Sequence, residues 1–158
     1  MENSVKRLSV LMLIAASIVA SCSPQSAPCV PATTATQPLI GPEAQAVSGD
    51  QLETWALFFT TPDMPDMPPG GEIRIGESKQ IKIVWRVTGS GSFTIDAVGP
   101  DGTTIEPDWG PEIHAGSSWQ RPGEEWGTGW TFPSLGCWRF QVQRGDSSAT
   151  LDVEVVSA

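Results

Sequence analysis

The segment between residues 109 and 130 carries four tryptophans within 22 residues, among Gly, Pro and carboxylate residues. A flat indole stacks on a sugar ring or anchors a protein contact, and neighbouring charged side chains can bind hydroxyl or charged groups. This pattern predicts a ligand-binding face. The candidate contact residues are Trp109, Trp119, Arg121, Glu124, Glu125 and Trp126.

The same tryptophans have a structural interpretation, in which the indoles cap the open ends of a small domain with long loops. Both interpretations stay open at this point. We expect Trp119 and Trp126 to be the most exposed rings. We expect Trp85, Trp130 and Trp138 to lie in the core, because each alternates with polar residues in a strand-like segment.

Several residues carry atoms that bind metals, but none has the spacing of a metal site. Met64, Met67 and His114 offer soft ligands for copper, and Cys137 with His114 supplies only two of the four ligands of a closed zinc site. We therefore predict no metal and no cofactor. The acidic residues that lack the fixed loop spacing of a calcium site are Asp96, Asp101, Glu106, Asp108 and Glu112.

Enzyme chemistry has little support in the sequence. His114 is the one histidine, there is no tyrosine, and no Gly-x-Ser-x-Gly or phosphate-binding glycine motif is present. A hydrolase that uses a carboxylate pair such as Glu112 and Glu125 stays open, because the geometry of the two carboxylates, and not their spacing in the sequence, decides whether they can act together. We expect no enzyme. A pocket where His114 meets two carboxylates would favour chemistry, whereas exposed coplanar indoles would favour binding.

The elements that must position these residues are β-strands. From Gln51 onward, β-forming residues alternate with Gly, Pro, Asp and Ser, and no segment has the periodicity of a helix. The clearest strand is 80–87, and residues 108–122 read as a long irregular stretch. The predicted strands are 55–60, 72–76, 80–87, 93–98, 103–105, 128–132, 136–142 and 149–155.

The end of the chain resembles the last two strands of immunoglobulin-like extracellular domains. Pro133 and Gly136 precede an aromatic alternating strand, and a turn at 144–146 leads into the final strand. The resemblance implies an all-β, immunoglobulin-like antiparallel β-sandwich of seven or eight strands over residues 51–158. Because only Cys137 lies inside that range, the core must depend on Trp and aliphatic packing instead of an inter-sheet disulfide.

The chain begins with the features of a secretion signal. Lys6 and Arg7 precede an uncharged apolar run of thirteen residues, Leu8 to Ala20. As a helix, that run rises only about 20 Å, which is short of the roughly 30 Å hydrocarbon core. Residues 1–21 are therefore predicted to be a signal peptide.

Val19-Ala20-Ser21-Cys22 ends the apolar run and resembles the lipobox of bacterial lipoproteins. The resemblance implies cleavage before Cys22, a diacylglyceryl thioether on its sulfur and, in many members, a further acyl chain on its amine. Trp119 to Trp138 is also similar to a pattern in uncharacterised bacterial lipoproteins. An ordinary cleaved signal with an accidental cysteine is the alternative.

Residues 22–50 are rich in Pro, Ala, Ser, Thr and Gln. That composition predicts a disordered, lipidated linker, because too little apolar surface is available to offset its ordering entropy. An oxidising compartment would permit Cys29 and Cys137 to pair. Because Cys29 lies in this linker and the bridge would close a very long loop, two free or separately used thiols are the favoured interpretation, and the disulfide stays open.

The charge balance excludes one class of partner. The chain has 9 basic and 18 acidic residues, and its formal charge is −9. The only basic cluster, Arg74, Lys79, Lys82 and Arg86, alternates with apolar residues, so we expect no nucleic-acid partner.

The sequence predicts a lipoprotein anchored to the cell membrane through Cys22, on the extracytoplasmic face. Its sandwich would be a non-catalytic binding module that meets an envelope protein or glycan at the Trp-rich loops. The alternative is an envelope hydrolase or metal-handling protein that uses acidic loop residues and His114.

Overall fold

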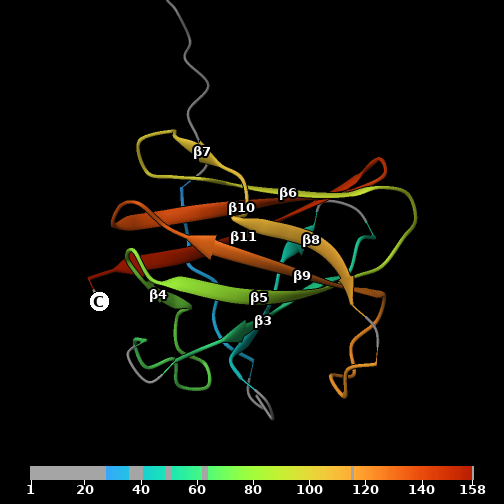
Figure 1. The fold of residues 1–158 in the computed structure, drawn as a ribbon, viewed down its shortest axis with the longest axis horizontal. Helices are drawn as coiled ribbons and strands as arrows, with labels where there is room; N and C mark the ends of the chain where they lie inside the picture. Colours follow the sequence, from blue (N-terminus) through green and yellow to red (C-terminus); the bar gives the residue numbers. More distant parts are fainter. Residues whose placement is uncertain (1–27, 36–40, 49–50, 62–63, 115, 158) are drawn as a thin grey trace, which may run out of the picture.

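A computed structural model describes residues 28–35, 41–48, 51–61, 64–114 and 116–157. The described chain is all-β, with two antiparallel sheets packed as a sandwich (Figure 1). In these ranges no helix is long and apolar enough to cross a membrane. The predicted signal peptide and Cys22 lie outside the described residues.

The first sheet has five strands in the order β1-β3-β5-β9-β8. All neighbours in it are antiparallel. The strands are β1 (Glu43–Gln45), β3 (Thr54–Phe59), β5 (Gln80–Val87), β9 (Glu124–Thr131) and β8 (Trp109–His114).

The second sheet has six strands, five of them in the order β2-β11-β10-β6-β7, while β4 pairs in parallel with the end of β11. Strands β10 and β11 form the predicted terminal hairpin, drawn in orange and red in Figure 1. The strands are β2 (Val47–Ser48), β4 (Arg74–Gly76), β6 (Phe93–Val98), β7 (Thr104–Ile105), β10 (Gly136–Arg144) and β11 (Ser147–Val156).

The strand order is that of an immunoglobulin domain. Strands β3, β5, β9 and β8 lie in the order of strands A, B, E and D, and β6, β10 and β11 lie as strands C, F and G. The predicted all-β sandwich is therefore confirmed. The described chain has eleven strands, more than the seven or eight predicted, because β1, β2 and β8 were not recognised.

The core follows from the alternation of each strand. Ile81, Ile83, Trp85 and Val87 of β5 are fully buried, as their period of two predicts. Trp85 meets Phe140 of β10 edge to face, with ring centroids 5.2 Å apart. Antibody domains join these two strands by a disulfide, and here an aromatic contact takes that place. The buried positions predicted for Trp85, Trp130 and Trp138 are confirmed.

One hydroxyl satisfies two of these buried indoles. Thr128 Oγ1 accepts hydrogen bonds from Trp85 Nε1 at 2.9 Å and from Trp130 Nε1 at 2.8 Å. The same hydroxyl donates to the carbonyl oxygen of Ile83 at 3.1 Å. A buried indole N–H without an acceptor would destabilise the fold, so Thr128 allows both tryptophans to occupy the core.

The domain begins well before the predicted boundary at Gln51. Strand β1 pairs with β3, and Thr33 forms a bridge to Glu72. Residues 28–35 and 41–48, assigned to the linker from composition, thus belong to the sandwich. Backbone hydrogen bonds to other strands of the sandwich order these residues. Amino-acid composition gives no sign of such bonds.

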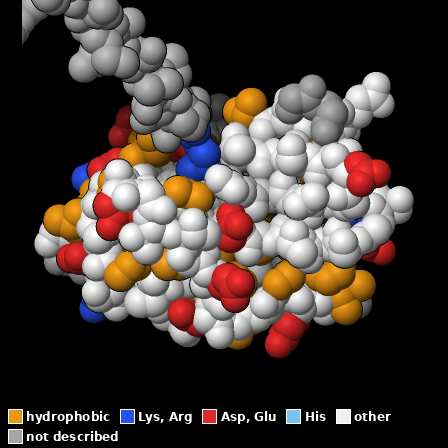
Figure 2. Space-filling view, turned by 90° about the horizontal axis from the view of Figure 1, so that it is seen from above, with side chains coloured by type: hydrophobic (Ala, Val, Ile, Leu, Met, Phe, Trp, Pro, Cys, Tyr) orange, Lys and Arg blue, Asp and Glu red, His pale blue; other side chains and the backbone are white. Residues whose placement is uncertain are grey.

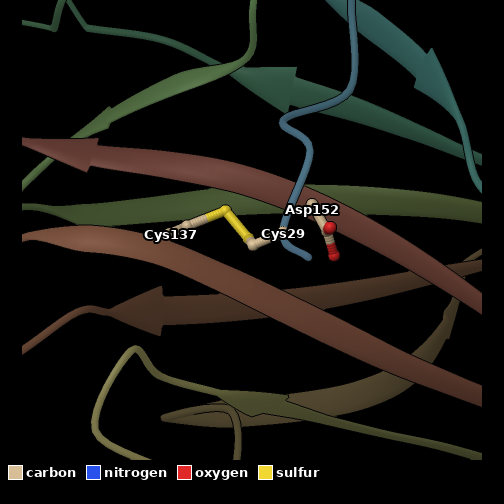
Figure 3. Close-up of side chains that lie close together, drawn as sticks. All are labelled: Cys29, Cys137 and Asp152. Carbon is tan, nitrogen blue, oxygen red and sulfur yellow. A yellow bond between two sulfur atoms is a disulfide. The ribbon is translucent and has the colours of Figure 1, made fainter. Parts of the chain in front are cut away.

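Cys29 and Cys137 form a disulfide across a sequence separation of 108, so the disulfide interpretation holds and the favoured one, separate thiols, is wrong. The segment that carries Cys29 lies against β11, where Ala32 N donates to the carbonyl oxygen of Asp152 at 2.7 Å. Figure 3 shows the bridge running from β10 to this segment. Packing of the segment brings the two sulfurs together.

The stretch expected to be irregular contains a strand. Trp109–His114 forms β8, paired with β9, and a register shift falls between Trp109 and Glu112. Strand β9 begins at Glu124, four residues before the predicted start at Thr128. Glu124, Glu125 and Trp126 therefore lie in a strand, whereas the sequence placed them in a loop.

Candidate functional site

The register of the first sheet places functional side chains in one row on its outer face. Arg86 pairs with Glu125, and Glu125 pairs with His114, across β5, β9 and β8. Trp55 of β3 is opposite Arg86 and continues the row. Directly opposed residues in antiparallel strands point to the same side, so the row follows from the pairing alone.

Glu125 is the centre of that row and is only 3% exposed. Its carboxylate forms an ion pair with Arg86 Nε at 3.0 Å and lies 3.2 Å from His114 Nδ1. Ser117 Oγ donates to it at 2.5 Å. A buried carboxylate needs such partners, and these three hold Glu125 in a single position.

The next row along the outer face is apolar. Leu57 and Val84 are paired neighbours on β3 and β5, and Trp119 packs on both in a cluster separate from the main core. The segment after β8 thus covers the sheet with an indole. Trp119 is 6% exposed, so the expectation that it would be among the most exposed rings is wrong.

Polar contacts fix Trp119 and the residues that follow it. Trp119 Nε1 donates to Glu43 Oε2 at 2.7 Å, and Arg121 forms an ion pair with the same carboxylate. The guanidinium of Arg121 lies over the Trp55 ring, 4.1 Å from its centroid. Glu43, which lies in the predicted linker, therefore ties residues 119–121 to β1.

A pocket of about 280 Å³ opens between these two rows. Its walls are largely apolar, and Glu125 and His114 supply charged and polar atoms at one side. We refer to it as the outer-face pocket. Its lining residues are Leu57, Phe59, Val84, His114, Ser117, Ser118, Trp119 and Glu125.

Trp109 lies beside this region because β9 has glycines on its outer face. A Cβ built on Gly129 would fall 1.8 Å from Trp109 Nε1, so the indole rests directly on the glycine backbone. A Cβ on Gly127 would contact both Trp109 and His114. The two glycines let these rings lie close to the sheet, and Trp109 is half-buried there.

The structure separates the predicted contact residues. Trp119 and Glu125 line the outer-face pocket, and Arg121 supports it through Glu43. Glu124 instead pairs with Arg144. Trp126 packs against Phe93 with ring centroids 5.2 Å apart, and it is half-buried where exposure was expected.

Five pocket residues were not identified from the sequence, although part of the signal for them was present: Leu57, Phe59, Val84, Ser117 and Ser118. Residues 55–59 are apolar at every position, and Val84 stands on the outward side of β5. A strand that is apolar on both sides is buried on both sides. The outward positions of Leu57, Phe59 and Val84 therefore indicated a cover over this sheet, whereas nothing local marks Ser117.

His114 meets one carboxylate, Glu125, and not the two that would have favoured chemistry. Ser117 Oγ donates its hydrogen bond to Glu125 and not to His114. A serine nucleophile is activated by a hydrogen bond to a base such as histidine, so this arrangement is not of that kind. Exposed coplanar indoles would have favoured binding, but Trp119 is buried and does not contribute to such an arrangement. The binding argument therefore depends on the pocket.

In the described ranges, one group of three side chains has the spacing of metal ligands, and it lies elsewhere. The sulfurs of Cys29 and Cys137 and the carboxylate of Asp152 are within 4.8 Å of one another (Figure 3). Both sulfurs are used in the disulfide, and Arg139 holds Asp152 through two contacts of 2.7 Å. This group is a structural clamp.

Comparisons with protein-family models, with curated proteins and with solved structures return no match to this chain.

Proposed function

We propose that this protein is a cell-envelope lipoprotein, anchored through lipid on Cys22, whose sandwich is a non-catalytic binding module. The outer-face pocket is its binding site. The ligand is an envelope glycan or a protein segment that presents one apolar ring or face together with a hydrogen-bond donor. The supporting observation is an apolar pocket with a buried, preoriented carboxylate at its side.

The Glu125 carboxylate can accept a hydrogen bond from an uncharged donor group on a ligand. Arg86 balances the charge of Glu125, and Ser117 and His114 complete its contacts. A ligand hydroxyl or amide N–H can add a hydrogen bond at this oxygen pair without bringing an unpaired charge into the pocket. The apolar faces of Leu57, Val84 and Trp119 supply the area for a ring to stack on.

Phe59 offers a test because it lines the pocket and is 43% exposed. Titration of the amide NMR spectrum with soluble oligosaccharides and peptides released from the native envelope should shift the signals of Val84, Ser118 and Trp119. Phe59→Ser should weaken that binding at least about tenfold, since about 1.4 kcal/mol of lost contact gives this factor.

The matched control is Ile113→Ser, which removes a hydrophobic side chain that is 68% exposed and outside the pocket. Both variants should melt within a few degrees of the wild type. Equal affinities for the two variants, or ligand-induced shifts confined to other faces, would contradict the assignment of this pocket.

A further inference from the structure

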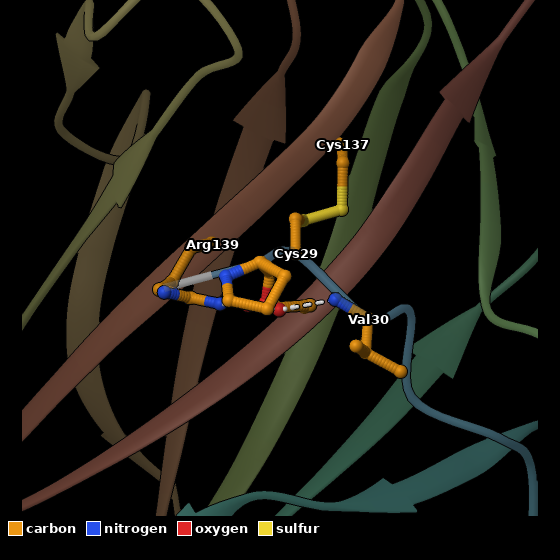
Figure 4. The surroundings of a disulfide bond; sticks show 6 residues. Cys29, Val30, Cys137 and Arg139 are labelled. Carbon is orange, nitrogen blue, oxygen red and sulfur yellow. Dashed lines mark hydrogen bonds and ion pairs between the residues drawn. A yellow bond between two sulfur atoms is a disulfide. The ribbon is translucent and has the colours of Figure 1, made fainter. Parts of the chain in front are cut away.

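The chain is clamped to the sandwich at Cys29, close to the predicted lipid. The disulfide joins Cys29 to β10, and Val30 N donates to Asp152 Oδ2 at 2.8 Å. Arg139 Nη2 donates to the carbonyl oxygen of Pro28 at 3.1 Å while it also pairs with Asp152. Figure 4 shows Cys29, Val30 and Arg139 gathered around the bridge. Residues 28–32 are thus a fixed part of the domain.

This clamp sets the reach of the anchor. Seven residue steps separate Cys22 from Cys29, and an extended chain spans at most about 3.6 Å per step, or about 25 Å in total. That reach is comparable to the width of a domain of this size, whose radius of gyration is about 13 Å. The linker predicted from composition would have been four times longer. The domain can turn on the membrane but stays at its surface.

The part of the domain next to the clamp carries the most exposed large apolar side chains in the described ranges. Val47 of β2 is 75% exposed and Val30 is 69% exposed. Both line a hollow of about 680 Å³ between residues 28–35 and strands β1, β2, β3 and β11. We call Pro28, Val30, Pro31 and Val47 the clamp-side surface.

The residues of the clamp-side surface are uncharged, and the hollow that they border has a balanced charge. The hollow is lined by one cation and one anion, Arg139 and Asp152, which pair with each other. The whole chain has a formal charge of −9, and the face in Figure 2 shows more Asp and Glu than Lys and Arg side chains. Anionic lipid repels acidic side chains, so the uncharged residues of the clamp-side surface approach it more readily than the acidic parts of the protein do.

We propose that the clamp-side surface rests on the lipid bilayer, with Val30 and Val47 at the interface between headgroups and acyl chains. This inference depends on the proposed lipidation of Cys22. The short reach keeps the surface near the membrane, its apolar side chains favour contact, and the surplus negative charge elsewhere opposes other orientations.

The test uses the full chain, purified from membranes after lipidation and placed in lipid nanodiscs of phosphatidylcholine and phosphatidylglycerol at 3:1. Intact mass first establishes the acyl chains. Doxyl-labelled lipid is then added, and the amide signals of Val30 and Val47 should lose more than half their intensity. Ile113, on β8 at the opposite edge of its sheet from β1, should lose little.

The variant V30E/V47E should abolish the loss at both sites, whereas I113E should leave it unchanged. Equal attenuation at Ile113 and Val47 in the lipidated wild type would overturn the docking proposal. So would a change at Val30 and Val47 that follows the number of copies per disc, because it would assign this surface to a second copy. An unlipidated mass would refute the proposed anchor itself, so the two failures are distinguishable.

Discussion

Thr128 is the residue with the most specific role in the core, because its hydroxyl accepts from two buried indoles and donates to Ile83. Thr128→Val keeps the shape and removes all three hydrogen bonds. Each buried group left unsatisfied costs about 1–3 kcal/mol, so we expect urea unfolding to show a loss of about 3 kcal/mol or more.

Thr128→Ser is the matched control, since it keeps the hydroxyl and loses one methyl group. It should cost about 1 kcal/mol, as one buried methyl does. If the valine variant were as stable as the serine variant, the hydrogen bonds of Thr128 would not explain how the two tryptophans are accommodated.

Asp96 gives the fold a defined pH dependence. Burial raises the pKa of this carboxyl above 3.8, and the nearby Glu106 raises it further. In the described chain its Oδ1 is buried and finds no donor. The folded state therefore favours the protonated form, and its contribution to stability is lost as pH rises from 3.8 through the raised pKa.

Asp96→Asn removes this ionisation, so it should melt at a higher temperature than the wild type at pH 7. The difference should shrink as the pH falls through the raised pKa towards 3.8, the ordinary value for aspartate, and should be smallest below 3.8. Thermal melts between pH 3 and 7 measure it, and Glu106→Gln should give a smaller change in the same direction. A difference that grows on acidification would contradict the sign of this effect.

Among the elements, residues 28–35 depend most on a single covalent link. The Cys29–Cys137 bridge spans 108 positions, and a disulfide typically stabilises a protein by about 2–4 kcal/mol. Replacing both cysteines by serine should lower the unfolding free energy by about that amount and speed amide exchange at Val30 and Ala32.

Reduced wild-type protein is the control for the double serine variant, and the two should unfold at the same urea concentration. An oxidised wild type that unfolds at the same midpoint as its reduced form would show that residues 28–35 are held by backbone pairing alone.

Strands with an unbroken period of two were predictable from the sequence, as β5 shows with the same bounds in the prediction and the structure. Strands β1 and β2 were not predictable, because they are short, and their pairing to β3 and β11 orders them. The same holds for β8, where Gly110 and Pro111 interrupt any alternation. The alternation of apolar and polar residues identifies strands that bury one face. Strands without that alternation can be identified only from their pairing in the structure.

The candidate site was predictable only in part. Trp119 and Glu125 were identified by residue type, and both line the pocket. Trp119 was expected to be exposed because it lies in the predicted irregular stretch 108–122, whereas it covers Leu57 and Val84. The ion pair between Glu43 and Arg121 joins residues 78 positions apart, and no local pattern marks such a contact.

At the scale of the whole molecule, most of the described arginines are occupied by carboxylates. Arg86, Arg121, Arg139 and Arg144 each form such a pair. The remaining acidic side chains leave the protein with a surplus of negative charge, which in the proposed lipoprotein would repel most of the surface from anionic lipid. This role of the charge depends on the proposed lipid anchor on Cys22, which is the central claim to test.

Intact mass spectrometry of the protein from its native membrane, with and without reduction and alkylation, tests the anchor most directly. We predict loss of residues 1–21 and a gain of two or three acyl chains. Two cysteines, Cys29 and Cys137, should be alkylated only after reduction. A mass without acyl chains, whether cleaved or not, would contradict the lipoprotein assignment, and alkylation before reduction would contradict the clamp.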